Sequence, residues 1–226
     1  MKRLLSVLSA LALTATPVFA DPEIRNWKTM HSLGCLLTEE CKDDVTLINS
    51  IEDIQKLYPD VDYSEYAEEF NALIKEFKRI GINPSLAGGK YFPRLHRGVY
   101  ATNTNNFFLN KEYMNNPKFL IDVTRHEGWH AVQDCMAGTI DNNHIAIVHP
   151  EESIPNLYRL RADVAYSGNP HVIPWESEAL WAGEQPDVTL NALKVCKNDQ
   201  TAMWDVYTPT PMTGEWLIKK GFWDGK

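Results

Sequence analysis

The chain has 226 residues, with 22 lysines and arginines against 30 acidic residues and a formal net charge of −8. An acidic chain of this kind is a poor candidate for binding nucleic acid or an anionic membrane surface. Its length and its hydrophobic fraction of 44% suffice for one substantial core, which predicts a single domain.

The first twenty residues have the features of a signal peptide. Lys2 and Arg3 precede an apolar run from Leu4 to Leu13, and Val18-Phe19-Ala20 fits a cleavage site. The apolar run is too short to span a bilayer, and no later stretch approaches the needed length. We therefore expect residues 1–20 to be removed and one domain over residues 21–226 to be exported to the periplasm or secreted, without stable membrane insertion.

Four cysteines, all after residue 20, predict two disulfides in an oxidising compartment. Of the three possible pairings, we favour Cys35–Cys41, which closes a small loop, together with Cys135–Cys196, which ties two helices. A zinc site made of cysteines is the competing interpretation, but no Cys-x-x-Cys spacing occurs.

The first third of the mature chain reads as an irregular arm followed by two helices. Residues 21–42 show no sustained period. Apolar residues at every third position predict a helix from Asp44 to Tyr58, and a second helix is expected from about Ser64 to Ile80. The predicted buried positions of this second helix are Tyr66, Phe70, Leu73, Ile74 and Phe77.

Residues 81–97 contain several prolines and glycines and are expected to form a loop. A small basic cluster there, Arg94, His96 and Arg97, is either a solvated surface or a subsite for an acidic substrate or a carboxylate end. Two short strands are then expected, over 98–101 and 106–110.

A long helix is expected over about 117–137. Asn116 can cap it, Pro117 suits its first position and Gly138 can end it. It carries His126-Glu127-x-x-His130, whose two imidazoles lie on one helical face and can bind one zinc ion. Glu127 lies to the side, within reach of a water molecule on the metal.

The remaining segments are expected to be mainly helical. Ile145 to Val148 is either a buried strand or a loop, and a helix is expected over about 150–167, with Leu157, Leu160, Val164 and Tyr158 facing inward. Further helices are expected from Pro174 to Gly183 and from Pro186 to Cys196. An aromatic patch near the C-terminus is expected to dock on the body of the domain: Trp216, Phe222 and Trp223.

His126-Glu127-x-x-His130 resembles the active-site helix of the zincin metallopeptidases. Glu176, followed three residues later by the small Ala179, resembles the second helix of the gluzincin branch, where such a glutamate is the third zinc ligand. The resemblance covers about residues 98–182. It implies an α+β, mostly helical zincin-like core with a small sheet packed on the metal helix, a Zn²⁺ cofactor, and an edge strand that accepts an extended peptide. Leu180 departs from the pattern, because many relatives have there an acidic residue that supports a ligand histidine.

A catalytic zinc site needs a third protein ligand. Asp134 is too short to join both histidines at one ion, so we assign it to orienting an imidazole. Glu176 is favoured by its position beside Ala179 and by the resemblance, while Glu178 and a histidine such as His149 or His171 stay open. The other candidates by residue type are His144, Glu151 and Glu152.

The reaction implied is hydrolysis of a peptide bond, with Glu127 as the general base on zinc-bound water. An oxyanion donor is also needed, and Tyr158, Tyr166 and His171 qualify by type. The expected substrate is a peptide or protein, such as a peptide of the cell envelope. Two other interpretations remain: a metal-binding or envelope interaction protein without turnover, and a metal-free structural domain. The substrate and the oligomeric state do not follow from the sequence.

Overall fold

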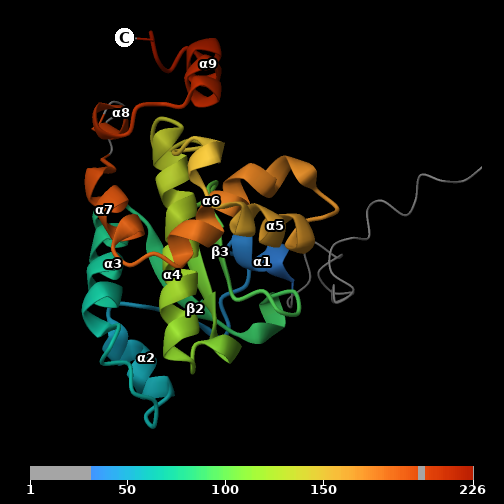
Figure 1. Cartoon of the computed structure of the whole chain (residues 1–226). Coiled ribbons are helices and arrows are strands. Elements are labelled where there is room, and N and C mark those ends of the chain that lie inside the picture. The colour runs from blue at the N-terminus through green and yellow to red at the C-terminus, as the bar shows by residue number, and fades with distance from the viewer. Residues whose placement is uncertain (1–31, 198–201, 226) are drawn as a thin grey trace, which may run out of the picture.

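The computed structural model describes residues 32–197 and 202–225, which form an α+β fold with helices around a small mixed sheet (Figure 1). This confirms the expected α+β, mostly helical class with a small sheet, while the zincin-like core stays a prediction. The predicted signal peptide and the start of the arm lie outside the described residues. No described helix combines the length and the apolar character needed to cross a bilayer.

Four strands form the sheet: β1 (Val45–Leu47), β2 (Asn83–Ala87), β3 (Gly98–Ala101) and β4 (Asn106–Asn110). Their order is β1-β2-β4-β3; β2 and β4 run parallel, and the other neighbours are antiparallel. The strands β3 and β4 lie where the sequence predicts them. Among the strands of the described residues, β3 pairs only with β4 and so forms one edge of the sheet.

Both faces of the sheet are covered. Successive side chains of β4 point to opposite faces, and all of them are buried. Phe107 and Leu109 face the main core, whereas Phe108 faces a smaller cluster that includes Leu36 of α1 (Leu33–Leu37). The short 3₁₀ helix Gly89–Tyr91 and the disulfide Cys35–Cys41 belong to this smaller cluster. The first favoured cysteine pairing is therefore confirmed.

The expected helix over 44–58 is wrong in its first half, which forms β1. Asp44 has a positive φ of 59°, and the Ile48 N–H donates to the Pro84 carbonyl at 2.9 Å, so this segment pairs with β2. Only α2 (Ile51–Leu57) is helical. An apolar residue at every third position fits a short strand followed by a helix as well as one helix, and the pairing with β2 decides between them.

The expected loop over 81–97 is also wrong in part, because it contains β2. Pro84 lacks an N–H but keeps the carbonyl that receives Ile48, and Leu86 and Ala87 are buried. Proline is unusual in a strand with neighbours on both sides. Tertiary pairing outweighs the local signal here.

The helix α3 (Ala67–Arg79) buries the predicted stripe of Phe70, Leu73, Ile74 and Phe77 against the main core. Beside it lies the central helix α4 (Pro117–Met136), which starts and ends within a residue of the expected bounds. The Asn116 side chain accepts the Phe119 N–H at 3.1 Å, and Pro117 occupies the first position, as predicted.

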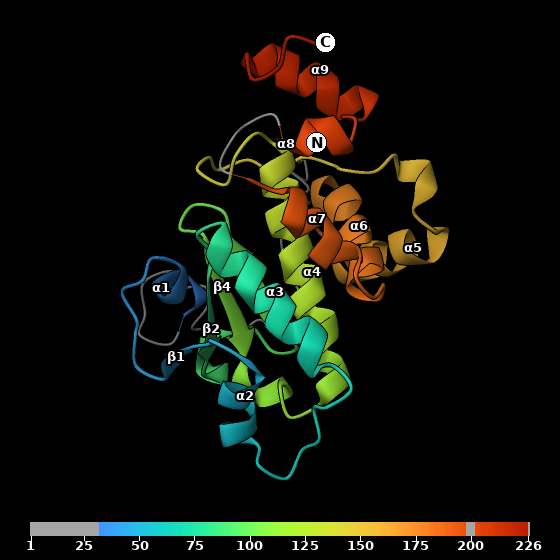
Figure 2. The ribbon, with the colours of Figure 1, turned by 90° about the vertical axis from the view of Figure 1, so that its left-hand side faces the viewer.

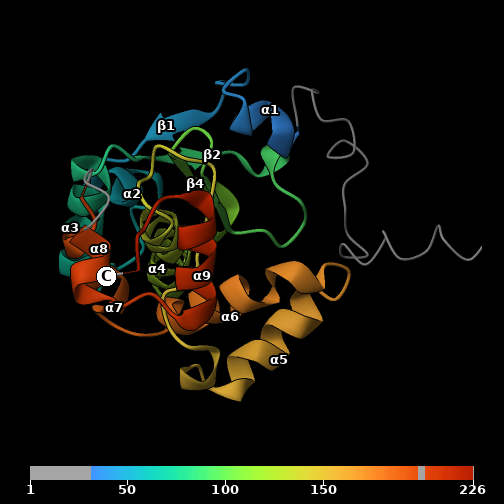
Figure 3. The same cartoon turned by 90° about the horizontal axis from the view of Figure 1, so that it is seen from above.

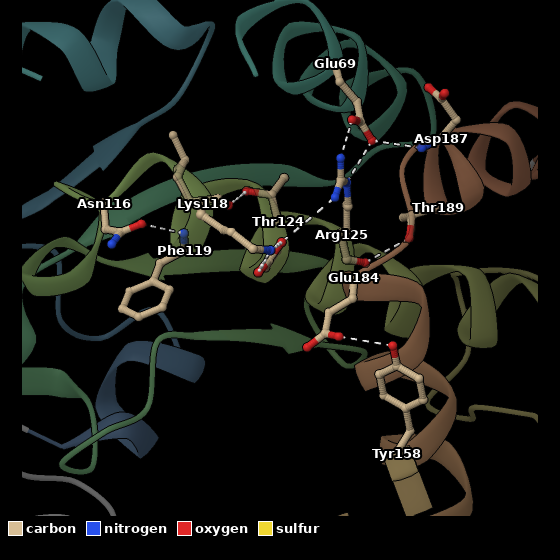
Figure 4. Close-up of polar contacts among 12 residues, drawn as sticks. Glu69, Asn116, Lys118, Phe119, Thr124, Arg125, Tyr158, Glu184, Asp187 and Thr189 are labelled. Carbon is tan, nitrogen blue, oxygen red and sulfur yellow. Dashed lines mark hydrogen bonds and ion pairs between the residues drawn. The ribbon is translucent and has the colours of Figure 1, made fainter. Parts of the chain in front are cut away.

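Several neighbours hold α4 in place. The Arg125 guanidinium donates to Glu69 of α3 at 2.8 and 2.5 Å, and the Thr189 hydroxyl donates to the Arg125 carbonyl at 3.0 Å (Figure 4). Thr189 belongs to α7 (Val188–Val195). In Figure 3, which looks along α4, the helix lies between the sheet and the pair α5 and α6; Figure 2 shows the same layers from the side.

The predicted inward face of the helix over 150–167 is right for Tyr158 and wrong for its three aliphatic residues. A 3₁₀ turn (Glu151–Ser153) precedes α5 (Asn156–Ala165), whose Leu157, Leu160 and Val164 are exposed. Its buried side chains are Tyr158 and Ala162. This helix packs against α6 (Ile173–Gly183), and the Tyr158 hydroxyl donates to Glu184 at 3.0 Å. Because α5 buries only a narrow strip of its surface, most of its apolar side chains are exposed to solvent.

The C-terminal part packs at the end of α4 (Figure 1). The predicted disulfide Cys135–Cys196 joins α4 to the end of α7. After it come α8 (Ala202–Val206) and α9 (Pro211–Lys220). Trp216 of α9 contacts His144 edge-on at 5.3 Å between ring centroids, and the Trp204 and Trp223 ring centroids are 6.2 Å apart, so the aromatic patch docks on the body as predicted.

Candidate metal centre

Three side chains converge between α4 and α6. His126 and His130 come from α4 and Glu176 from α6; one ligand atom from each lies within 4.8 Å of the others. The His126 Nε2 to Glu176 Oε2 distance is 3.5 Å, and that from His130 Nε2 to Glu176 Oε1 is 3.7 Å. Ligands about 2.1 Å from a tetrahedral zinc ion stand about 3.4 Å apart, so this spacing suits one ion.

Small residues let the two helices approach closely enough for this. Ala179 and Ala182 of α6 are fully buried. A Cβ on Gly183 would lie 3.0 Å from the Asp122 carbonyl oxygen and 3.1 Å from the His126 Cβ. Ala179, expected to make room for Glu176, is therefore one of three small residues at this helix contact, with Ala182 and Gly183.

The group has an unsatisfied buried atom that a cation would satisfy. Glu176 Oε2 is buried and has no hydrogen-bond partner among residues 32–197 and 202–225. Burial would raise the pKa of Glu176, but the two imidazoles hold it well below its usual range. Burial also opposes charging of His130, yet the Glu176 carboxylate raises the pKa of His130 to about 9. These shifts favour a protonated His130 beside an ionised Glu176, and a divalent cation that binds here replaces the proton of the imidazole.

A buried chain of hydrogen bonds orients His130. Its Nδ1 lies 2.8 Å from Gln133 Oε1, and Gln133 Nε2 donates to Glu178 at 2.8 Å and to the Trp175 carbonyl at 3.1 Å. Because both donors of the amide are directed there, its oxygen is left to accept, and His130 Nδ1 carries the proton. His130 Nε2 is then the atom available to a metal.

Glu178 is therefore a supporting residue rather than part of the metal group. Its carboxylate also accepts the backbone N–H groups of Val148 at 3.1 Å and His149 at 2.5 Å. Among the histidine alternatives, the His149 ring stacks on Trp129 at 5.5 Å between centroids, and His171 is exposed. Of the candidate third ligands, Glu176 alone joins the two α4 histidines in the described part of the chain.

The role expected of Asp134 is wrong. It accepts the Tyr100 hydroxyl at 2.8 Å, while its Oδ1 is buried without a partner in the described residues. Burial raises the pKa of Asp134 to about 8. Gln133 takes the orienting role instead. Its signal was the three-residue spacing from His130, which places both side chains on one face of a helix.

Glu127 lies next to His126 in α4 and extends toward β3. Its Oε2 accepts the Tyr100 N–H at 2.9 Å. Gly98 passes so close that a Cβ there would lie 2.9 Å from Glu127 Cγ and 2.7 Å from Val123 Cγ1. Burial raises the pKa of Glu127, although both imidazoles oppose this. A carboxyl with a raised pKa is suited to accepting a proton near neutral pH.

A cleft of about 440 Å³ opens onto this site, and we call it the metal cleft. The α4 residues His126 and Glu127 form part of its lining, and α5 and α6 contribute Tyr166 and Leu180. The basic cluster Arg94, His96 and Arg97 lines it too, which the sequence left open.

Of the three tyrosine and histidine donors considered from the sequence, only Tyr166 lines the metal cleft. Burial and the nearby Glu176 and Glu127 raise its pKa, so its hydroxyl keeps the proton. Tyr158 is engaged with Glu184. His96, which sequence reasoning did not consider as a donor, faces the same group: burial lowers its pKa while Glu176 opposes this.

The described residues thus bring two histidines and a glutamate to one point, beside a further glutamate and an open cleft. Such a group could hold a divalent metal ion. The two disulfides are typical of proteins from an oxidising compartment. Comparison with protein-family models, with characterised proteins and with solved structures found no match to this chain.

Proposed function

We propose that this protein is an exported zinc-dependent metallopeptidase. The observation that carries the proposal is the position of Glu127 next to His126 in the lining of an open cleft, on the helix that brings His126 and His130 to Glu176. A protein that only bound the metal would need the three ligands but no fourth, protonatable residue next to them.

His126, His130 and Glu176 would hold the zinc ion. When bound, zinc lowers the pKa of a water molecule and polarises a carbonyl group. Two nitrogen ligands and one carboxylate form a ligand set found in catalytic zinc sites. Gln133 and Glu178 keep the His130 ring turned toward the site through the contacts described above.

Glu127 is the general base. The Tyr100 N–H fixes its Oε2 at 2.9 Å, which leaves Oε1 to take a proton from the attacking water. Glu127 then donates this proton to the leaving amine. The raised pKa makes the Glu127 carboxylate a stronger base than a carboxylate with the ordinary pKa.

Tyr166 and His96 are the groups that can donate to the carbonyl oxygen as negative charge develops on it. Both line the metal cleft, and Glu176 influences the pKa of each. The substrate would lie along β3. The Arg97 carbonyl accepts the Asn110 N–H at 2.8 Å, so Arg97 faces β4 and the next residue, Gly98, turns its backbone groups to the free edge.

The test is zinc content together with peptide cleavage. The purified protein with both disulfides formed should hold about one zinc per chain and cleave members of a peptide library. Glu127→Gln should keep the zinc and lose on the order of 10²–10⁴-fold in rate. The matched control, Glu215→Gln, changes an exposed glutamate on α9 and should cleave like the parent.

Zinc binding without cleavage of any peptide would contradict the enzyme and leave a metal-binding protein. Equal cleavage by the parent and by Glu127→Gln would assign the activity to a contaminant. No zinc at neutral pH would contradict the metal site itself.

A further inference from the structure

Basic side chains gather in the metal cleft of an otherwise acidic protein. Arg94, Arg97 and Arg161 line it together with His96. Two of the carboxylates that line the same cleft are already bound by basic side chains: Glu184 by Arg161 at 2.5 Å, and Asp122 by Lys118 at 2.7 Å. Glu127, the third, is the proposed general base.

Within residues 32–197 and 202–225, no carboxylate pairs with Arg97. Its guanidinium lies over the Phe119 ring at 3.9 Å and near the Tyr113 ring at 5.7 Å. It makes no hydrogen bond or ion pair with the rest of residues 32–197 and 202–225. Stacking occupies the face of a guanidinium and leaves its N–H edge available, in a geometry that matches both oxygens of a carboxylate.

The backbone holds this arginine in place. The Arg97 carbonyl accepts the Asn110 N–H, and the His96 carbonyl accepts the Asn110 side chain, both at 2.8 Å. These two hydrogen bonds fix the backbone from which the Arg97 side chain extends, just before β3. Rigid attachment lowers the entropy lost when a ligand binds.

The distance from the metal group follows from α4. Phe119, under the guanidinium, and His126 are seven residues apart in one helix, which is two turns or about 10 Å. An extended peptide covers about 3.3 Å per residue, so about three residues span this distance. Figure 4 shows Phe119 in the first turn of α4.

We propose that the metal cleft selects peptides that carry a carboxylate about three residues from the bond to be cleaved, and that Arg97 binds this carboxylate. The inference rests on the proposed peptidase function. The carboxylate can be an acidic side chain or the free C-terminus of the substrate, and both offer Arg97 the same two oxygens.

Binding is measured first, because it does not depend on turnover. Glu127→Gln protein is incubated with one equivalent of zinc and with pools of short random peptides. Paired pools carry Glu or Gln at one fixed position, and each pool is made with a free or an amidated C-terminus. Peptides retained with the protein are quantified by mass spectrometry.

We expect about tenfold stronger retention of the carboxylate-bearing pools, and loss of this preference in the double variant with Arg97→Gln. Preference for Glu at one position would identify a side-chain carboxylate; preference for the free C-terminus would identify the chain end. Arg97→Lys should keep only part of the preference, because lysine has the positive charge but lacks the two parallel N–H donors of the guanidinium. The control Arg159→Gln removes an arginine from outside the metal cleft and should leave the preference unchanged.

Equal retention of acid and amide pools, a preference that survives Arg97→Gln, or no retention of any pool would each overturn the inference. Cleavage is then measured with active protein on the retained peptides. If carboxylate preference depends on Arg97 but no peptide is cut, the inference holds and the peptidase function fails. If peptides are cut without that preference, the function holds and the inference fails.

Discussion

Two glutamates of α6, the partly buried Glu176 and the buried Glu178, lie in very different surroundings. Glu176 joins His126 and His130 in the metal group, whereas Glu178 borders a second cavity of about 520 Å³ that is also lined by His149 and Arg159. The second cavity is the larger, but Glu178 there is bound by Gln133 and by two backbone N–H groups. Glu176 has a buried oxygen without a partner in the described chain. An unsatisfied charged atom, and not the size of the hollow, marks the place for a ligand.

Asp134 extends this comparison to a third buried carboxyl. It too has an oxygen without a partner among the described residues, but no imidazole lies against it, and its pKa is raised to about 8. It therefore meets the cost of burial by keeping a proton. The three carboxyl groups thus meet the cost of burial in different ways. Glu178 accepts hydrogen bonds, Asp134 keeps a proton, and Glu176 is placed to bind a cation.

The largest expected effect separates the two glutamates of α6. Glu176→Gln should weaken zinc binding by about a thousandfold or more, because a neutral amide replaces a charged ligand. Glu178→Gln should weaken it by about 10–100-fold, the usual effect of a residue that orients a ligand. Zinc dissociation constants from competition with a chromophoric chelator give both values. Equal losses of zinc affinity in the two variants would contradict the assignment of Glu176 as a zinc ligand and of Glu178 as a residue that only orients one.

Removing the metal should lower the stability of the protein only when Glu176 is present to bind it. At free zinc a thousandfold above the dissociation constant, binding stabilises the fold by about 4 kcal/mol. Chelation should then lower the melting temperature by roughly 10 °C. Glu176→Gln is the matched control and should not respond to the chelator. An unchanged melting temperature of the parent would show that its histidines are satisfied without metal.

Gly98→Ala changes the wall of the metal cleft without touching the second cavity. A Cβ would press on Glu127 and Val123 at under 3 Å, so Glu127 must move. A displacement of about 1 Å in a catalytic group can cost about a hundredfold in rate. Peptide cleavage should fall by that order while zinc content stays at the parent value. An unaffected rate would show that β3 does not position the base.

The last prediction concerns the pH dependence of stability that Asp134 causes. Its pKa rises from 3.8 to about 8 on folding, so its contribution to stability is complete below pH 4 and is lost as the pH rises through 8. The slope is at most about 1.4 kcal/mol per pH unit. Asp134→Asn keeps an oxygen for the Tyr100 hydroxyl and cannot ionise, so its stability should fall less between pH 5 and pH 8. Urea unfolding at both pH values checks this, and identical slopes would contradict it.

Several features of the fold could be predicted because they depend on nearby residues. Asn116 and Pro117 fix the start of α4, and the spacing of Phe70, Leu73 and Phe77 fixes the buried face of α3. The features that sequence reasoning missed depend on distant partners. Pro84 sits in a strand because β1 and β4 pair with it from either side, and Leu157 is exposed because α5 meets only a narrow part of the molecule.

The same division runs through the candidate site. The sequence by itself determined that His126 and His130 share one face of α4 and that Glu127 lies beside them, because the helical period sets these directions wherever the helix packs. The tertiary structure alone decided that Glu176 joins the histidines and Glu178 does not, that Gln133 rather than Asp134 orients His130, and that Arg97 lines the cleft. Whether a buried polar atom finds a partner depends on residues from other elements, and no local pattern encodes them.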